Sequence, residues 1–185
     1  NSFITAIDLS ATSLSYAKRK AEELNIKNIE FLQMDILDLV NFDKKFNIIE
    51  AVGVLHHMAE PFKGWKTLNN RLIPGGLMMI GLYSKIARDH IGTIRDIINK
   101  LDIKMNKKNI INFREKIISS NANHYKLIKQ SPDFYSLSNL VDLLFHVQEH
   151  RFTISDIDNY ISKINLKFCG FENKELLNLF RATHN

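Results

Sequence analysis

The chain has 185 residues, of which 45% are hydrophobic and 24% charged, with only 3 Pro and 7 Gly. This composition is that of a globular domain and excludes the disordered and collagen-like classes. No apolar run approaches the roughly 18 residues of a membrane span, and the start Asn1-Ser2-Phe3 lacks the pattern of a signal peptide. The single cysteine, Cys169, cannot form an internal disulfide, so we expect a cytoplasmic protein in which Cys169 is a small buried residue.

The net charge of +5 is unevenly distributed along the chain. Residues 1–60 carry a net charge of −3, residues 61–130 carry +10 and residues 131–185 carry −2. A basic segment can attract nucleic acid or acidic partners, whereas lysines spread along the polar faces of helices more often form a solvated surface. The charge leaves both interpretations open. Nucleic-acid binding is possible, and the basic segment 61–130 is the one feature of the sequence that points to it.

The first half of the chain alternates predicted strands with predicted helices. Apolar, β-rich runs predict four strands, at Phe3 to Ile7, Ile29 to Met34, Phe46 to Val52 and Leu77 to Leu82. Helical spacing predicts two helices, at Leu14 to Leu24 with Ser10 or Thr12 as cap, and at Pro61 to Leu72 with Pro74-Gly75-Gly76 as the stop. Strands joined by crossover helices form a parallel sheet, so we predict an α/β doubly wound fold.

The second half is predicted to be mainly helical. From Ser84 on, helical spacing of apolar residues covers Ile86 to Leu101, Ile110 to Ile117, Leu137 to Phe145 and, capped by Thr153 or Ser155, Ile157 to Ile164. Leu166 to Phe171 has strand-like character, and Lys174 to Arg181 predicts a last helix. We therefore divide the chain into a partial core (1–83), a basic helical subdomain (84–155) and a carboxyl-terminal helix and strand (156–185) that return to the core.

Acidic residues end two successive predicted strands, in Ile7-Asp8-Leu9-Ser10 and Gln33-Met34-Asp35-Ile36. Ligands of open α/β sheets bind at the carboxyl ends of the strands, where one acid can accept hydrogen bonds from ribose hydroxyls and another from an adenine amino group. Asp8 alone is equally consistent with a turn residue or a helix N-terminal acid. The pair of acids indicates a nucleotide-like ligand.

Together with these acids, Val54-Leu55-His56-His57-Met58 and Leu72-Ile73-Pro74-Gly75-Gly76 resemble the class I S-adenosylmethionine-dependent methyltransferases over about residues 3 to 83. The resemblance implies a Rossmann-like fold and S-adenosylmethionine as cofactor. It also implies that Asp8 holds the cofactor ribose, that Asp35 lies beside the adenine, and that the cofactor surface comprises Asp8, Leu9, Met34, Asp35, Ile36, Val52 and Gly53.

Residues Phe145 to Glu172 further resemble the carboxyl-terminal part of bacterial methyltransferases that often follow tetratricopeptide repeats, a group whose methyl acceptors are mostly unassigned. The family's first strand and glycine-rich loop have no counterpart before residue 3. We therefore expect a chain truncated at its amino end, with that strand, a Gly-rich turn and a helix encoded directly upstream. A fragment of this kind lacks half of the cofactor site.

Methyl transfer is a displacement from an activated sulfonium, so alignment does most of the catalysis and a base is needed only if the acceptor holds a proton. His56 and His57 lie in the loop where the resemblance expects the acceptor, and either can act as the base or simply shape the loop. Tyr83 and Arg88 follow the fourth strand and can line the acceptor pocket. A tyrosine at a strand end and an arginine in a first helical turn also occur without such a role.

The segment His146-Val147-Gln148-Glu149-His150 matches the H-x-x-E-H pattern, in which two histidines on one helix face bind zinc and the glutamate activates water. Zinc needs a third protein ligand, and the same segment belongs to the methyltransferase resemblance, so we predict no metal. We expect instead that His146, Glu149, His150 and Arg151 contact the acceptor, or satisfy one another at a helix end.

The predicted function is S-adenosylmethionine-dependent methyl transfer to a small-molecule or macromolecular acceptor. A non-catalytic binding module on the same fold stays an alternative, because the glycine-rich loop is missing. An NAD-type dehydrogenase would share the ribose acid, but Val52 to Met58 followed by Pro74-Gly75-Gly76 favours the methyltransferase.

Overall fold

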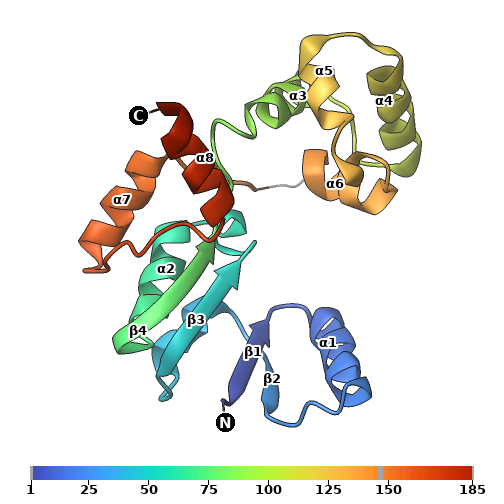
Figure 1. Ribbon diagram of the computed structural model, residues 1–185. Coiled ribbons are helices and arrows are strands. Elements are labelled where there is room, and N and C mark those ends of the chain that lie inside the picture. Colours follow the sequence, from blue (N-terminus) through green and yellow to red (C-terminus); the bar gives the residue numbers. More distant parts are fainter. Residues whose placement is uncertain (1, 146–147, 185) are drawn as a thin grey trace. The chain divides into compact units, whose positions relative to one another are not determined.

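The computed structural model describes residues 2–145 and 148–184, and the chain divides into two compact units, Asn1–Phe152 and Thr153–Asn185 (Figure 1). The first unit contains strands β1 to β4 and helices α1 to α6, and the second contains α7 and α8. Within the described ranges, no helix is long and apolar enough to cross a membrane.

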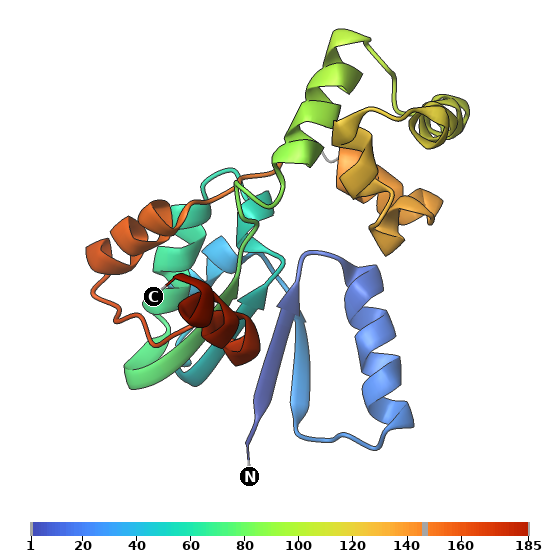
Figure 2. The ribbon, with the colours of Figure 1, turned by 45° about the horizontal axis from the view of Figure 1, so that its top comes forward.

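The strands of the first unit form two parallel pairs, β1 with β2 and β3 with β4. A parallel pair needs a crossover connection, which α1 supplies for the first pair and α2 for the second. Figure 2 shows α1 lying alongside the β1–β2 pair. The bounds of these elements are β1 (Ile4–Asp8), α1 (Ala11–Glu23), β2 (Ile29–Gln33), β3 (Phe46–Val52), α2 (Pro61–Asn69) and β4 (Leu72–Gly81). The predicted alternation of strand and crossover helix is confirmed.

Two helical elements begin at the strand ends that carry the predicted cofactor acids. The Ser10 hydroxyl accepts a hydrogen bond from the Ser13 amide at 3.1 Å and caps α1, which settles the choice between Ser10 and Thr12. After β2, Asp35 caps the 3-10 helix Ile36–Asn41 by accepting from the Leu37 amide at 2.8 Å.

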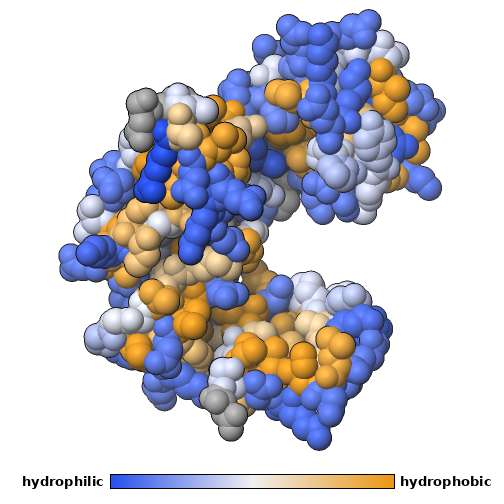
Figure 3. All heavy atoms as spheres, in the orientation of Figure 1, coloured by the Kyte–Doolittle hydropathy of each residue, from blue (hydrophilic) through white to orange (hydrophobic). Residues whose placement is uncertain are grey.

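Both strand pairs leave apolar side chains in contact with solvent. Ile48 and Val52 of β3 are 62% and 57% exposed, and Leu77 of β4 is 57% exposed. On the first pair, Ile4 is 46% exposed, and Figure 3 shows apolar side chains gathered over this part of the chain. Sheets of parallel strands are ordinarily covered on both faces, and these pairs are covered incompletely.

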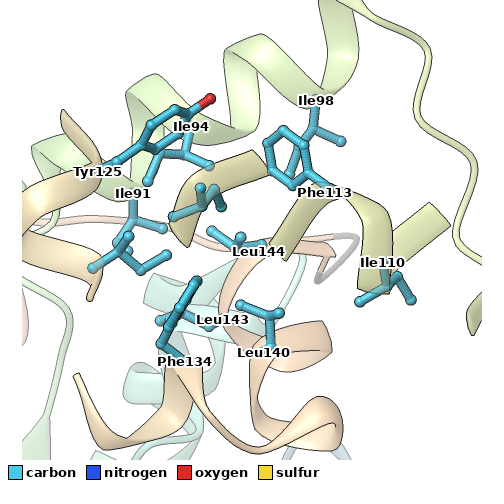
Figure 4. Close-up of a cluster of buried hydrophobic side chains, with 12 residues drawn as sticks. Ile91, Ile94, Ile98, Ile110, Phe113, Tyr125, Phe134, Leu140, Leu143 and Leu144 are labelled. Atoms are coloured by element: carbon cyan, nitrogen blue, oxygen red, sulfur yellow. The ribbon is translucent and has the colours of Figure 1, made fainter. Parts of the chain in front are cut away.

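Helices α3 to α6 surround a core of their own, in which Ile94, Ile117, Ile128 and Phe134 are all 0% exposed. Figure 4 shows side chains from every one of these helices converging on this cluster. Arg88 precedes α3, and the short 3-10 helix Pro132–Phe134 lies between α5 and α6. The helix bounds are α3 (Asp89–Lys100), α4 (Lys107–Ser119), α5 (Asn123–Ile128) and α6 (Leu137–Phe145).

The second unit contains α7 (Ile154–Lys163) and α8 (Lys174–His184). Thr153 caps α7 in a capping box: its hydroxyl accepts from the Asp156 amide, and the Asp156 carboxylate accepts from the Thr153 amide. Of the two caps that the sequence allowed, the structure uses Thr153 and not Ser155.

Several sequence-based predictions are wrong in detail. The predicted strand Leu166 to Phe171 is not formed, because no described segment supplies it with a ladder of hydrogen bonds, and Cys169, expected to be buried, is exposed. The second helix ends at Asn69 and β4 begins at Leu72, so Pro74-Gly75-Gly76 lies inside a strand. The register is irregular there, which accommodates a proline without an amide hydrogen and Gly75 at a φ of 78°.

Candidate functional site

The loop after β3 turns sharply at Gly53, whose φ of 77° favours glycine. Nothing lies within 4 Å of the position that a Cβ at Gly53 would occupy, so this side of the loop is open. The 3-10 helix Leu55–His57 follows, with Leu55 0% and His56 1% exposed. The loop is therefore buried at Leu55 and His56 and open to solvent or a ligand at Gly53.

His56, Tyr83 and Arg88 form a stack next to this loop. The His56 and Tyr83 ring centroids are 3.7 Å apart with an angle of 25° between the planes, and the Arg88 guanidinium carbon lies 3.7 Å from the Tyr83 centroid. Two planar groups at this separation cannot share one face of a ring, so Tyr83 is held between the other two. Stacking on an aromatic ring suits the flat, weakly hydrated guanidinium.

The Glu149 carboxylate is 2% exposed and binds two arginines. Arg88 donates through Nε at 3.2 Å and Nη2 at 2.8 Å, and Arg95 of α3 donates through Nη2 at 3.0 Å. Arg95 also donates to the Leu143 carbonyl at 3.0 Å, which connects the carboxylate to α6. A buried carboxylate with this many charged donors is held in a single position.

Residues 148–152, here called the strap, run beside the loop and the end of β4. Four hydrogen bonds hold the strap: His150 N to His56 O at 2.8 Å, Phe152 N to Tyr83 O at 2.8 Å, Lys85 N to Phe152 O at 2.9 Å, and His57 Nδ1 to Gln148 O at 3.1 Å. Segments almost a hundred residues apart in the sequence are thus joined through backbone groups and one imidazole.

A pocket of about 390 Å³ opens beside this assembly. The rings of His57 and Tyr83 lie on its wall and are nearly perpendicular, at 89°, with their centroids 5.8 Å apart. His57 is half-buried, in contrast to its neighbour His56. The residues lining the pocket are His57, Tyr83, Arg88, Asp133, Asn139, Asp142 and Leu143.

Burial lowers the pKa of His56 to about 4, and the positive charges of His57 and Arg88 act in the same direction. The Gly81 carbonyl and the Glu149 carboxylate raise this pKa by smaller amounts. Neither ring nitrogen of His56 makes a well-formed hydrogen bond within the described part of the chain. His56 is therefore an uncharged, tightly packed ring at neutral pH.

Two of the remaining predicted acceptor-side residues, His150 and Arg151, belong to the strap. Arg151 donates from Nη1 to the Arg88 carbonyl at 3.3 Å, and its guanidinium fills the space over Gly92. The Nε2 atom of His150 is buried and makes no hydrogen bond to the described residues. His146 lies outside the described residues.

The zinc pattern, already weighed and set aside on sequence grounds, needs its members on one helix, and Gln148 to His150 are not helical. The Glu149 carboxylate is bound by Arg88 and Arg95. Across residues 2–145 and 148–184, no three side chains of the metal-binding types come together.

The predicted cofactor-side residues lie at the carboxyl ends of the strands. One Asp8 carboxylate oxygen accepts from the Ser10 amide at 2.7 Å and one Asp35 oxygen from the Leu37 amide at 2.8 Å. In the described residues, no hydrogen bond occupies the second oxygen of either acid. Leu9 is 66% and Val52 57% exposed, while Met34 and Ile36 are half-buried.

Arg95, which binds Glu149, and three of the residues that line the pocket were not identified from the sequence. Arg95 lies beside Ile91, Ile94 and Ile98, which are the buried residues of α3, and a charged residue next to an apolar stripe was a usable signal. The pocket residues Asp133, Asn139 and Asp142 carried no such signal, because they come from a different part of the chain and are exposed.

Residues 1–131 of the chain match the family described as a methyltransferase domain. The chain belongs to this family. Membership confirms the methyltransferase resemblance predicted from the sequence. It also agrees with the α/β fold and the parallel strands.

Among proteins of similar sequence, an uncharacterized protein of Synechococcus sp. is 27% identical over 180 residues, which are 93% of this chain and 43% of that protein. A tRNA U34 carboxymethyltransferase of Campylobacter fetus is 40% identical over 53 residues, 29% of this chain and 19% of that enzyme.

Among solved structures, PKMT2 from Rickettsia typhi matches with a TM-score of 0.70, and PKMT2 in complex with AdoHcy with a TM-score of 0.66. Both are 19% identical and cover 98% of this chain and 39% of that protein. This likeness confirms the Rossmann-like methyltransferase fold. The chain spans less than half the length of both PKMT2 and the Synechococcus protein.

The strand-end residues fit the cofactor of this family. The available carboxylate oxygens of Asp8 and Asp35 are acceptors for hydroxyl and amino groups, and the exposed side chains of Leu9 and Val52 suit an apolar base. The open space at Gly53 permits the backbone to approach a ligand closely.

Proposed function

We propose that this protein is an S-adenosylmethionine-dependent methyltransferase in which the carboxyl ends of β1, β2 and β3 hold the cofactor. In this proposal Asp8 binds the ribose hydroxyls, Asp35 the adenine amino group, and the Gly53 turn faces the methionine part. Leu9, Met34, Ile36 and Val52 supply the apolar surface. The observation that carries the proposal is the strand-end position of both acids, each with an available oxygen, in a chain of the methyltransferase family.

The acceptor side of the proposed enzyme comprises residues 84–152 with the loop after β3. The pocket beside His57, Tyr83 and Arg88 supports this assignment, because it lies next to the loop that follows β3. Glu149, His150 and Arg151 contribute through the strap. The bound cofactor supplies a methyl group on a positively charged sulfur, so the chain's task is to align the acceptor, keep water out and remove a proton where the acceptor has one.

Calorimetric titration of the protein expressed from its complete gene tests the cofactor site. Asp8→Ala should weaken S-adenosylmethionine binding by about 1.5–3 kcal/mol, or roughly ten- to 150-fold, because hydrogen bonds to a charged acceptor are lost. Asp43→Ala removes an exposed acid from the loop before β3 and should leave the affinity unchanged. Equal affinities in the wild type and Asp8→Ala, with both proteins folded, would assign Asp8 to the turn alone.

Titration with NAD in the same experiment separates the alternatives. The proposal predicts binding of S-adenosylmethionine and no measurable binding of NAD. Binding of NAD alone would favour a dehydrogenase, and binding of neither ligand would favour a non-catalytic module. Incubation of the enzyme with methyl-labelled S-adenosylmethionine and separate protein, RNA and small-molecule fractions of a cell extract would then identify the class of acceptor.

A further inference from the structure

We infer that His57 is the general base of this site, that the Gln148 carbonyl holds its ring in the orientation required, and that Glu149 is the positioning residue that keeps the strap in place. The inference rests on the proposed function, since it assumes an acceptor that carries a proton. It chooses between two adjacent histidines that the sequence could not separate, and it gives Glu149 a role that does not involve touching the acceptor.

The hydrogen bond to Gln148 fixes which nitrogen of His57 carries the hydrogen. A carbonyl oxygen can only accept, so Nδ1, 3.1 Å from the Gln148 oxygen, must be the donor. The neutral ring therefore carries its lone pair on Nε2. Edge contacts with His56 at 4.3 Å and with Tyr83 at 5.8 Å between centroids restrict the ring further. In a histidine that acts as a base, one ring nitrogen takes up the proton while the other donates a hydrogen bond to a fixed oxygen, and His57 has this arrangement with the Gln148 carbonyl.

The two adjacent histidines differ in their exposure to the pocket. His57 lines the pocket, whereas His56 is 1% exposed and stacked on Tyr83. An acceptor bound in the pocket would therefore lie against His57 and not against His56. His56 instead provides a rigid, uncharged surface against which Tyr83 packs.

Ion pairs of the Glu149 carboxylate hold the strap in place. Its carboxylate binds Arg88 at 2.8 Å and Arg95 at 3.0 Å, and it directly follows Gln148 in the chain. On its other side, His150 donates a backbone hydrogen bond to the His56 carbonyl at 2.8 Å. The oxygen that orients His57 thus belongs to a backbone fixed by a two-arginine ion pair, so loss of the carboxylate should release His57 as well.

The proposed step balances without a further reactant. The acceptor atom forms its bond to the methyl carbon, the methyl–sulfur bond breaks with its electron pair staying on sulfur, and the acceptor's proton passes to Nε2 of His57. The resulting imidazolium keeps its Nδ1–H bond to Gln148 and returns the extra proton to water. Tyr83, Arg88, Asp133 and Asp142 are the other titratable groups on the pocket wall that His57 shares.

Nuclear magnetic resonance of protein labelled with ¹⁵N in its histidines tests the orientation without cofactor or acceptor. In alkaline buffer the ring of His57 should give the Nδ1–H pattern, the opposite of the form that the neutral ring of free histidine prefers. Glu149→Gln should shift His57 toward the ordinary Nε2–H pattern, while Glu115→Gln, a control on the exposed side of α4, should leave it unchanged. A wild-type His57 with the Nε2–H pattern would overturn the inference even if no variant folds.

Methyl transfer from labelled S-adenosylmethionine to the active extract fraction tests the base itself. His57→Asn keeps a donor for the Gln148 carbonyl but has no basic nitrogen, and it should lower the rate by at least about 100-fold. Cofactor affinity should stay within about twofold of wild type, and His124→Gln, a histidine of α5, should behave like wild type. An undiminished rate in His57→Asn would overturn the inference. Failure of the wild type to bind the cofactor would instead overturn the proposed function, and the ring orientation would still be measurable.

Discussion

The helical region α3 to α6 and the two strand pairs belong to the same unit but are stabilised differently. Phe134 and Ile94 in the helical region are 0% exposed, whereas Ile48 in β3 is 62% exposed. The helices pack against others nearby in the sequence, so their apolar stripes meet without help from distant segments. The strands pair in twos, and each pair leaves apolar surface uncovered.

This difference shows why helices are the self-sufficient part of the chain. An amphipathic helix has one apolar stripe to bury, but a strand of a parallel sheet needs partners along its edges and cover on both faces. Stability should therefore depend steeply on the helical core and weakly on the exposed strand residues. The first prediction below tests that contrast directly, and two further predictions with smaller expected effects concern His56 and the start of α7.

Phe134→Ala should destabilise the protein most, because it opens a cavity in the helical core. The expected loss is about 3–5 kcal/mol of unfolding free energy. Ile48→Ala, on a strand residue that is mostly exposed, should cost no more than about 0.5 kcal/mol. Urea denaturation followed by circular dichroism measures both. Equal losses would contradict the contrast between the regions.

Acid should weaken the strand-end loop through His56. Its pKa of about 4 in the folded protein lies below the usual value of 6.5, so the unfolded chain binds the proton more tightly. The stabilisation is complete above about pH 6.5 and is lost as the pH falls toward 4, amounting to about 3 kcal/mol for this shift. Denaturation midpoints measured across this range should fall accordingly.

A variant isolates the contribution of His56 from those of other groups. His56→Phe keeps a ring against Tyr83 but cannot bind a proton, so its stability should change less with pH than that of wild type. Burial also lowers the pKa of His90, whose contribution remains in both proteins. His124→Gln should retain the wild-type dependence. Parallel curves for wild type and His56→Phe would show that His56 is protonated equally in the folded and unfolded states.

The smallest effect is expected in the second unit, at the start of α7. Thr153→Ala removes the hydroxyl that accepts from the Asp156 amide, while the backbone amide of residue 153 can still donate to the Asp156 carboxylate, and the loss should cost about 1 kcal/mol. Ser155→Ala, two residues later, should cost only a few tenths, since Ser155 is not the cap. Amide hydrogen exchange in α7 measures the local change. A larger loss in Ser155→Ala than in Thr153→Ala would contradict the cap assignment.

The sequence predicted those elements that local patterns encode. Strands β1 to β3 follow from hydrophobic runs. For two helices the sequence limited the cap to two candidates each, and the structure uses Ser10 and Thr153. The prediction of a strand over Leu166 to Phe171 was wrong, because an apolar run becomes a strand only if a partner is available. Cys169 was predicted as buried from its neighbours, which says little about what covers them.

The family, the strand-end acids and the two candidate histidines could be read from the sequence, because each is encoded by adjacent residues such as Asp8 with Leu9 or His56 with His57. Only the tertiary structure joined Glu149 to Arg88 and Arg95 and brought the Gln148 carbonyl to His57. These contacts connect positions separated by 54 to 91 residues. No local pattern encodes such a pairing, because it depends on how the chain between the partners folds back.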